Sequence, residues 1–280
     1  IYYKIKNLQK YFYQNKIFIK RQFILNQLIN HLKNNNNLPA ICFIFSKKNV
    51  EIAAKEITIN LFDKEDIIPN IIEAECKKIL INKLKNYKEF IELDEYKDII
   101  NLLKKGIAIH HAGILPILRE MIELLFEKKY IKLLFATETF AVGINMPTKT
   151  VIFTSLSKFS ENKHRYLLPH EYTQMAGRAG RRGIDTIGHV FHCNNLFKDD
   201  FTLNEYKSVL IGHSNMLSSQ FKISYNLILN LINTSSQENK NKIENYIENI
   251  LIYFMEKSFM NLDIQKEIKY YENEEIELKN

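Results

Sequence analysis

The residue types best suited to chemistry lie in residues 174–183, QMAGRAGRRG. From Gly177 to Gly183 this stretch holds three arginines and three glycines. Glycine lets a backbone or a phosphate approach closely, and a guanidinium binds phosphate oxygens in pairs without losing its charge. Arg178 and Arg181 are three residues apart, so on a helical turn they would point the same way and could stabilise a transferring phosphoryl group. The competing interpretations are a basic surface turn and a targeting run.

A second stretch, residues 136–147 (ATETFAVGINMP), follows an apolar run that is expected to form a strand. Thr137 and Glu138 are therefore expected at the carboxyl end of that strand, where open α/β sheets bind their ligands. A hydroxyl group and free backbone N–H groups at the start of a helix suit a phosphate oxygen. Taken alone, the same Thr-Glu-Thr sequence is equally a helix cap.

Short apolar runs alternate along the chain with stretches of helical spacing, which indicates an α/β domain with a mostly parallel sheet. After residue 198 the strand signals end, and helical patterns are expected at 220–233 and 243–260. Strands are predicted at 40–45, 106–109, 131–136, 150–154 and 189–191, and helices at 17–33, 48–60, 73–90, 94–104 and 116–128.

The composition narrows the class of protein. Hydrophobic residues make up 46% of the 280 residues and charged residues 25%, which excludes a disordered, collagen-like or disulfide-rich chain. The net charge of +7 is compatible with nucleic-acid binding but is weak support for it. The apolar runs are all shorter than the roughly 20 residues of a membrane span, so no membrane association is expected. Cys42, Cys76 and Cys193 lie far apart and are expected to be reduced thiols.

Together these stretches resemble motifs V and VI of the superfamily-two helicases, and residues 38–48 resemble motif IV. With His110-His111-Ala112-Gly113 between them, the combination most resembles the superkiller-type DExH RNA helicases. The resemblance covers residues 17–260 and implies a RecA-like parallel sheet flanked by helices, the P-loop NTPase-like C-terminal domain of a helicase. We therefore expect this second RecA-like domain at residues 1–197 and the α-helical start of a winged-helix domain at 198–280.

The resemblance implies roles for matched positions in nucleotide binding. Arg178 and Arg181 match the two catalytic arginines that reach the phosphates of ATP across the cleft between domains. Gln174 matches the glutamine on the nucleotide side of motif VI. Gly143 and Asn145 match motif V positions near the nucleotide.

Other matched positions are expected to contact nucleic acid. Thr137 matches the motif V threonine that touches the RNA backbone, Glu138 lies beside it, and Ser46 is a further expected backbone contact. The pair His110-His111 is interpreted as structural because no third ligand lies at metal spacing, and no metal site is expected in this chain.

The sequence contains neither a P-loop, G-x-x-x-x-G-K-[ST], nor a DExH tetrad. In the resembling family both belong to the first RecA-like domain, so the Mg ligands are expected there, and the chain is expected to be part of a longer protein. Residues 1–280 alone are therefore expected to be inactive with ATP.

The function implied by the resemblance is an ATP-dependent 3′-to-5′ RNA helicase that feeds RNA to exosome-mediated decay. Its expected partners are single-stranded RNA and subunits of an exosome-linked complex, and its expected location is cytoplasmic. The alternatives are a nuclear exosome-associated or organellar relative, or a non-catalytic RNA-binding scaffold.

Overall fold

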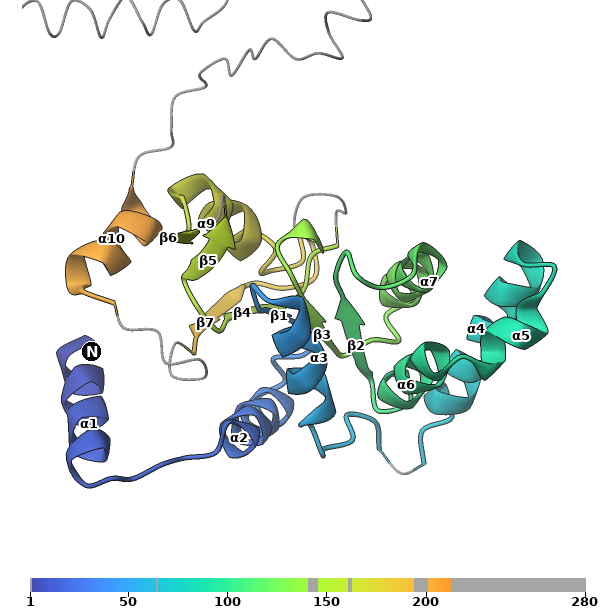
Figure 1. Ribbon diagram of the computed structural model, residues 1–280, viewed down its shortest axis with the longest axis horizontal. Coiled ribbons are helices and arrows are strands. Elements are labelled where there is room, and N and C mark those ends of the chain that lie inside the picture. The colour runs from blue at the N-terminus through green and yellow to red at the C-terminus, as the bar shows by residue number, and fades with distance from the viewer. Residues whose placement is uncertain (1, 64, 141–145, 161–162, 194–200, 213–280) are drawn as a thin grey trace, which may run out of the picture. The chain divides into compact units, whose positions relative to one another are not determined.

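A computed structural model describes residues 2–63, 65–140, 146–160, 163–193 and 201–212 (Figure 1). Within them the chain forms a five-stranded parallel sheet with strand order β2-β3-β1-β4-β7, so the predicted α/β, RecA-like class is confirmed. The strands of this sheet are β1 (Ala40–Phe43), β2 (Ile107–His110), β3 (Leu133–Ala136), β4 (Thr150–Phe153) and β7 (His189–His192).

The strands form where they were predicted because each is a short apolar run that a parallel sheet can bury on both faces. Every residue of β1, β2, β3 and β4 is buried. Only the edge strand β7 is partly exposed. The register places Ile41 opposite Leu134 on one side and Val151 on the other, so all carboxyl ends meet at one edge of the sheet.

The helices before β4 connect and cover the strands, and most begin within a few residues of the predicted position. α7 begins at Pro116, which suits a first helical turn because proline has no N–H to donate. The first helix, α1, was not predicted. The helices before β4 are α1 (Tyr2–Gln14), α2 (Arg21–Asn34), α3 (Lys47–Lys55), α4 (Ile68–Lys83), α5 (Tyr87–Glu92), α6 (Asp94–Leu103) and α7 (Pro116–Glu127).

Two neighbouring histidines show that helices lie on both faces of the sheet. His110 ends β2 and lies 2.8 Å from Glu123 of α7, whereas the next residue, His111, lies 3.2 Å from Glu51 of α3. Successive residues of an extended chain point to opposite faces, so α7 and α3 cover opposite faces of β2.

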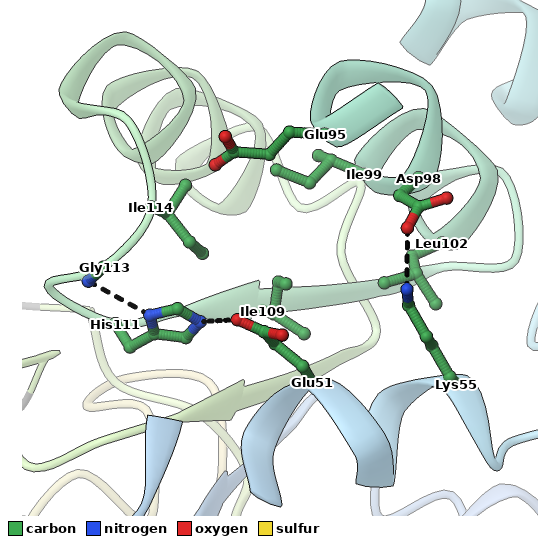
Figure 2. Close-up of a pocket in the computed structure, with 10 residues that line it drawn as sticks. All are labelled: Glu51, Lys55, Glu95, Asp98, Ile99, Leu102, Ile109, His111, Gly113 and Ile114. Atoms are coloured by element: carbon green, nitrogen blue, oxygen red, sulfur yellow. Dashed lines mark hydrogen bonds and ion pairs between the residues drawn. The ribbon is translucent and has the colours of Figure 1, made fainter. Parts of the chain in front are cut away.

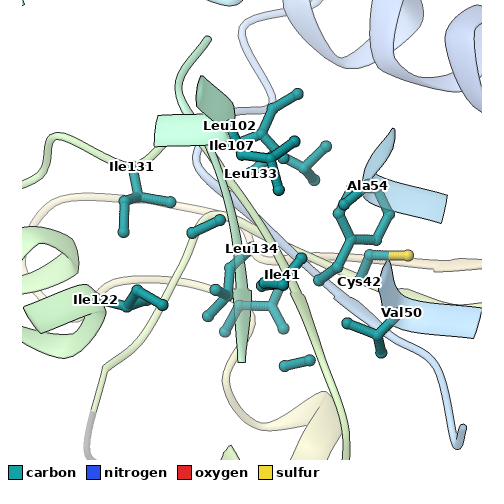
Figure 3. Packing of buried hydrophobic residues seen from close by; sticks show 14 of the residues in the cluster. Ile41, Cys42, Val50, Ala54, Leu102, Ile107, Ile122, Ile131, Leu133 and Leu134 are labelled. Atoms are coloured by element: carbon teal, nitrogen blue, oxygen red, sulfur yellow. The ribbon is translucent and has the colours of Figure 1, made fainter. Parts of the chain in front are cut away.

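The core fills both faces of the strands with aliphatic and aromatic side chains (Figure 3). Phe43, Phe135 and Phe153 are fully buried within the sheet. Figure 3 shows Val50 of α3 and Ile122 of α7 on opposite sides of strand side chains such as Ile41. Each large apolar side chain buried in this way stabilises the fold by about 1.5–3 kcal/mol. We call β1–β4 with α2–α7 the scaffold.

A small polar unit follows β4, and the sequence pattern did not predict it. β5 (Ser157–Ser160) and β6 (Lys163–Tyr166) form an antiparallel hairpin, α9 (Pro169–Ala176) follows, and a turn at residues 177–188 leads to β7. Figure 1 shows the hairpin and α9 near the β4–β7 end of the sheet, opposite α4–α6. We call residues 157–188 the functional arm.

The last described helix, α10 (Leu203–Ile211), packs against α9. By its contacts the chain divides into the units Ile1–Ser214 and Asn215–Asn280. Within the region predicted as the α-helical start of a winged helix, residues 198–280, the structure describes only residues 201–212, which contain α10. The helices predicted at 220–233 and 243–260 lie outside the described residues. The boundary at 197/198 stays a prediction.

Candidate functional site

The structure places Ser46, Thr137 and Glu138 at the carboxyl edge of the sheet, because each follows a parallel strand. Ser46 comes three residues after β1, and its hydroxyl accepts a hydrogen bond of 3.4 Å from the backbone N–H of Asn49. Ser46 is therefore the N-cap of α3. Its predicted contact with RNA stays a prediction, and the cap shows why a serine is favoured there in any case.

Thr137 is held firmly where β3 ends. Its backbone N–H donates to the carbonyl of His110 (3.2 Å), and its hydroxyl lies 3.1 Å from that of Thr139. Phe140 then anchors the segment, because its ring meets that of His110 edge to face at 4.9 Å between centroids. The buried aromatic ring fixes this segment against β2 and α7.

Glu138 is half-buried and lies 3.6 Å from the ammonium group of Lys158 in β5. The same ammonium lies 2.9 Å from Glu171 of α9. Sequence reasoning missed this pairing because Lys158 lies 20 residues after Glu138 and 13 residues before Glu171. Only the pattern Pro169 followed by Glu171 signalled a helix start there.

The predicted arginines lie at the opposite, amino edge of the sheet. α9 starts beside the carboxyl edge and ends at Ala176, and the carbonyl of Arg178 then accepts a 2.8 Å hydrogen bond from the N–H of Thr148, just before β4. The N–H of Gly180 donates back to the carbonyl of Thr148, which completes a short parallel bridge between Thr148 and Ala179.

This bridge corrects one expectation from the spacing of the arginines. Arg178 and Arg181 do not share a helical turn, because the helix has ended and Gly180 has a φ of +90°. Gly180 also passes close to Gly188. A Cβ on Gly188 would lie 2.5 Å from the carbonyl oxygen of Ala179, which is too close for any side chain. Two glycines therefore let the ends of the turn close on each other, and the backbone rather than helical periodicity positions the arginines.

Arg181 is held by a carboxylate that the motif analysis did not include. Its Nε and Nη2 donate to Asp185 at 2.7 and 2.8 Å, and its backbone N–H donates to the same carboxylate at 3.0 Å. These hydrogen bonds lower the pKa of Asp185 to about 2 and raise the pKa of Arg181. The pair remains charged at neutral pH, with the Nη1 edge of the guanidinium turned away from the carboxylate.

The structure describes only some of the other residues that were predicted to contact the nucleotide. Gln174 is exposed on α9, one turn before Arg178, which is half-buried. Gly143 and Asn145 lie outside the described residues. The structure thus brings Gln174, Arg178 and Arg181 to one end of α9, and it does not bring them together with Thr137 and Ser46.

The paired histidines diverge rather than converge. His111 lies in a cavity of about 320 Å³ between α3, α6 and the end of β2 (Figure 2). Its Nδ1 accepts the N–H of Gly113 at 3.1 Å, so the ring proton lies on Nε2, facing Glu51. Burial lowers the pKa of both His110 and His111, which favours the neutral form of each ring.

Two searches of the described residues bear on metals and membranes. No three His, Cys, Asp or Glu side chains among them gather closely enough to hold a metal ion. None of the helices described combines the length and the apolar character that crossing a membrane requires.

The sequence of this chain matches a known protein family and several known helicases. Residues 63–183 match the family described as "Helicase conserved C-terminal domain". The chain is 44% identical over 207 residues to "Antiviral helicase SKI2" of Saccharomyces cerevisiae, a match that covers 74% of this chain and 16% of that protein. The chain belongs to the superkiller-type DExH RNA helicases.

Other members are similarly close. "Exosome RNA helicase MTR4" of Homo sapiens is 39% identical over 206 residues, covering 74% of this chain and 19% of the relative. "DExH-box ATP-dependent RNA helicase DExH9" of Arabidopsis thaliana is 38% identical over 239 residues, covering 84% of this chain and 23% of the relative. The chain thus spans about a fifth of the length of these curated relatives and corresponds to the C-terminal helicase region of the family.

Proposed function

We propose that this chain is the second half of an ATP-driven motor that moves 3′-to-5′ along single-stranded RNA and delivers it to exosome-mediated decay. The observation that carries the proposal is the turn at the end of α9, where Arg178 and Arg181 are fixed to the amino edge of a helicase-family sheet. A protein that only binds RNA and does not hydrolyse ATP has no need for such a turn.

The donor set of this turn fits ATP. Within nine residues this turn carries the guanidinium groups of the half-buried Arg178 and Arg181 and of the exposed Arg182, together with the amide of Gln174. Such donors match the oxygens of a triphosphate, and arginine binds them in pairs. When bound, ATP supplies the phosphoryl group whose hydrolysis releases free energy. The family implies ATP use, and Mg²⁺ would accompany the nucleotide with ligands from a P-loop and DExH domain elsewhere in the protein.

The residues of this chain have two separate tasks in the proposed motor. Arg178 and Arg181 place positive charge where negative charge grows during phosphoryl transfer. At the other edge, Thr137 and the N–H groups around Ser46 contact the RNA backbone, which provides affinity without sequence preference.

Purified full-length protein tests the proposal. We expect RNA-stimulated ATP hydrolysis, and we expect Arg178→Ala to lower the stimulated kcat by at least about 100-fold, since one finger arginine contributes that much or more. Arg21→Ala is the matched control: it removes a half-buried guanidinium that binds Glu56 on the scaffold, and it should leave kcat unchanged. Residues 1–280 alone should hydrolyse no ATP.

Two results would contradict the proposal. Near wild-type turnover by Arg178→Ala would remove the finger role from that residue. A full-length protein that binds RNA without hydrolysing ATP would support the alternative function, a non-catalytic RNA-binding protein.

We further propose a cytoplasmic location, as for a superkiller helicase rather than a nuclear relative. The support is the identity of 44% to the yeast "Antiviral helicase SKI2" against 39% to the human "Exosome RNA helicase MTR4". Imaging of the tagged full-length protein tests this, and nuclear or organellar signal would favour the alternatives.

A further inference from the structure

Glu171 binds three segments of the functional arm at once. Its carboxylate accepts two hydrogen bonds from the guanidinium of Arg165 in β6, at 2.9 and 2.8 Å, and one from the N–H of Leu168 at 2.9 Å. The ammonium of Lys158 in β5 lies 2.9 Å away. The hairpin and the start of α9 therefore meet at one carboxylate.

The same cluster reaches the segment expected to contact RNA. Lys158 lies between two carboxylates, 2.9 Å from Glu171 and 3.6 Å from Glu138. Its side chain is only 12% exposed, so solvent screens these interactions weakly. Lys158 thus connects the residue beside Thr137 to α9.

From Glu171, the helix runs without interruption to the arginine turn. Tyr172, the next residue, packs on Phe153 of β4 with 5.0 Å between ring centroids, and Met175 is buried. Two residues beyond α9, the carbonyl of Arg178 accepts a 2.8 Å hydrogen bond from the N–H of Thr148. A short series of direct contacts therefore joins Glu138 to Arg178.

We propose that Lys158 and Glu171 are positioning residues that transmit the binding of RNA at Thr137 and Glu138 to the arginine turn at the other edge of the sheet. An RNA phosphate beside Glu138 repels that carboxylate and attracts Lys158, which changes how Lys158 is shared between Glu138 and Glu171. α9 then moves Arg178. This inference rests on the proposed function, because it concerns how RNA stimulates ATP hydrolysis.

Two variants of the full-length protein, Lys158→Met and Glu171→Gln, test the connection kinetically. We expect the maximal RNA-stimulated kcat to fall about tenfold while the RNA concentration for half-maximal stimulation stays within about twofold, because positioning is lost and not RNA affinity. Lys158→Arg keeps the charge and should restore stimulation. A raised half-maximal concentration would instead mean that Lys158 binds RNA, and unchanged stimulation in both variants would overturn the proposal.

A matched control separates transmission from loss of stability. Glu56 also accepts two hydrogen bonds from an arginine, Arg21, at 2.8 and 2.7 Å, and its side chain is 25% exposed against 19% for Glu171. Glu56→Gln should also lower the melting temperature but leave RNA stimulation intact. Equal loss of stimulation in both variants would assign the effect to stability alone.

Hydrogen exchange tests the connection even if the full-length protein has no RNA-stimulated activity. Without RNA or ATP, Lys158→Met should speed exchange both at the amides of Thr137 and Phe140 and at those of Arg178 and Gly180. Faster exchange within α9 alone would show a local role and overturn the proposal. Absence of ATPase in the wild type, with both segments responding to Lys158→Met, would overturn the proposed function and leave the mechanical connection standing.

Discussion

The scaffold and the functional arm are built from the same chain but held by different forces. In the scaffold, β1–β4 are buried at every residue and pack through apolar side chains. In the arm, β5 and β6 contain no fully buried residue. Met175 of α9 is buried and Tyr172 packs on Phe153, but ion pairs and backbone hydrogen bonds around Glu171, Asp185 and Thr148 join the segments of the arm.

This difference has a physical consequence. Apolar burial is non-directional and cannot be displaced by a charged ligand, so it suits a frame that must stay fixed. Ion pairs are directional, and an arriving phosphate competes for them because it offers the same kind of partner to a lysine or an arginine. A motor that responds to RNA and nucleotide therefore benefits from polar contacts where it moves and apolar contacts where it does not.

The largest expected effect separates the two regions by stability. Phe135→Ala in β3 removes a buried ring and should lower the free energy of unfolding by about 3–5 kcal/mol. Phe159→Ala in β5 should change it by less than about 0.5 kcal/mol, since that ring is 60% exposed. Chemical denaturation of both variants measures this, and similar losses would show that the arm has a core of its own.

A smaller effect separates the regions by activity. Asp185→Asn removes the charge that holds Arg181 and should lower the RNA-stimulated kcat of the full-length protein about tenfold, which is about 1.4 kcal/mol of transition-state stabilisation. Asp98→Asn is the matched control, because Asp98 pairs with Lys55 at 2.7 Å on the scaffold, and it should leave kcat unchanged. An unaffected Asp185→Asn would mean that the turn alone positions Arg181.

The smallest expected effect concerns pH. Burial raises the pKa of Glu171, but hydrogen bonds from Arg165, the Leu168 amide and Lys158 outweigh burial and lower the pKa to about 2. A lowered pKa in the folded state means that the stabilisation is complete above the ordinary value of 4.5 and is lost as pH falls towards 2.

The measurement compares wild type with Glu171→Gln by urea unfolding between pH 7 and pH 2. We expect the wild type to be more stable by about 1 kcal/mol at pH 7, after allowing for solvent screening, and the difference to shrink below pH 4.5. A difference that does not depend on pH would show that the shape of Glu171 matters and its charge does not.

Some parts of this protein were predictable from the sequence because their signals are local. Strands β1–β4 are short apolar runs that the fold buries completely. Pro116 marks the start of α7. The arginine and glycine spacing of residues 174–183 and the threonine after β3 identified the family without any knowledge of packing. The hairpin was missed because β5 and β6 lack an apolar face, so their pattern does not differ from that of a loop.

The sequence by itself thus determined the fold class and the family, and it predicted which side chains bind phosphate. Only the tertiary structure decided that Thr137 and Arg178 lie at opposite edges of the sheet, that Asp185 holds Arg181, and that Lys158 lies between Glu138 and Glu171. The reason is that an apolar pattern can be recognised from residues that are close in the sequence. An ion pair, in contrast, depends on where the folded chain brings distant charges together.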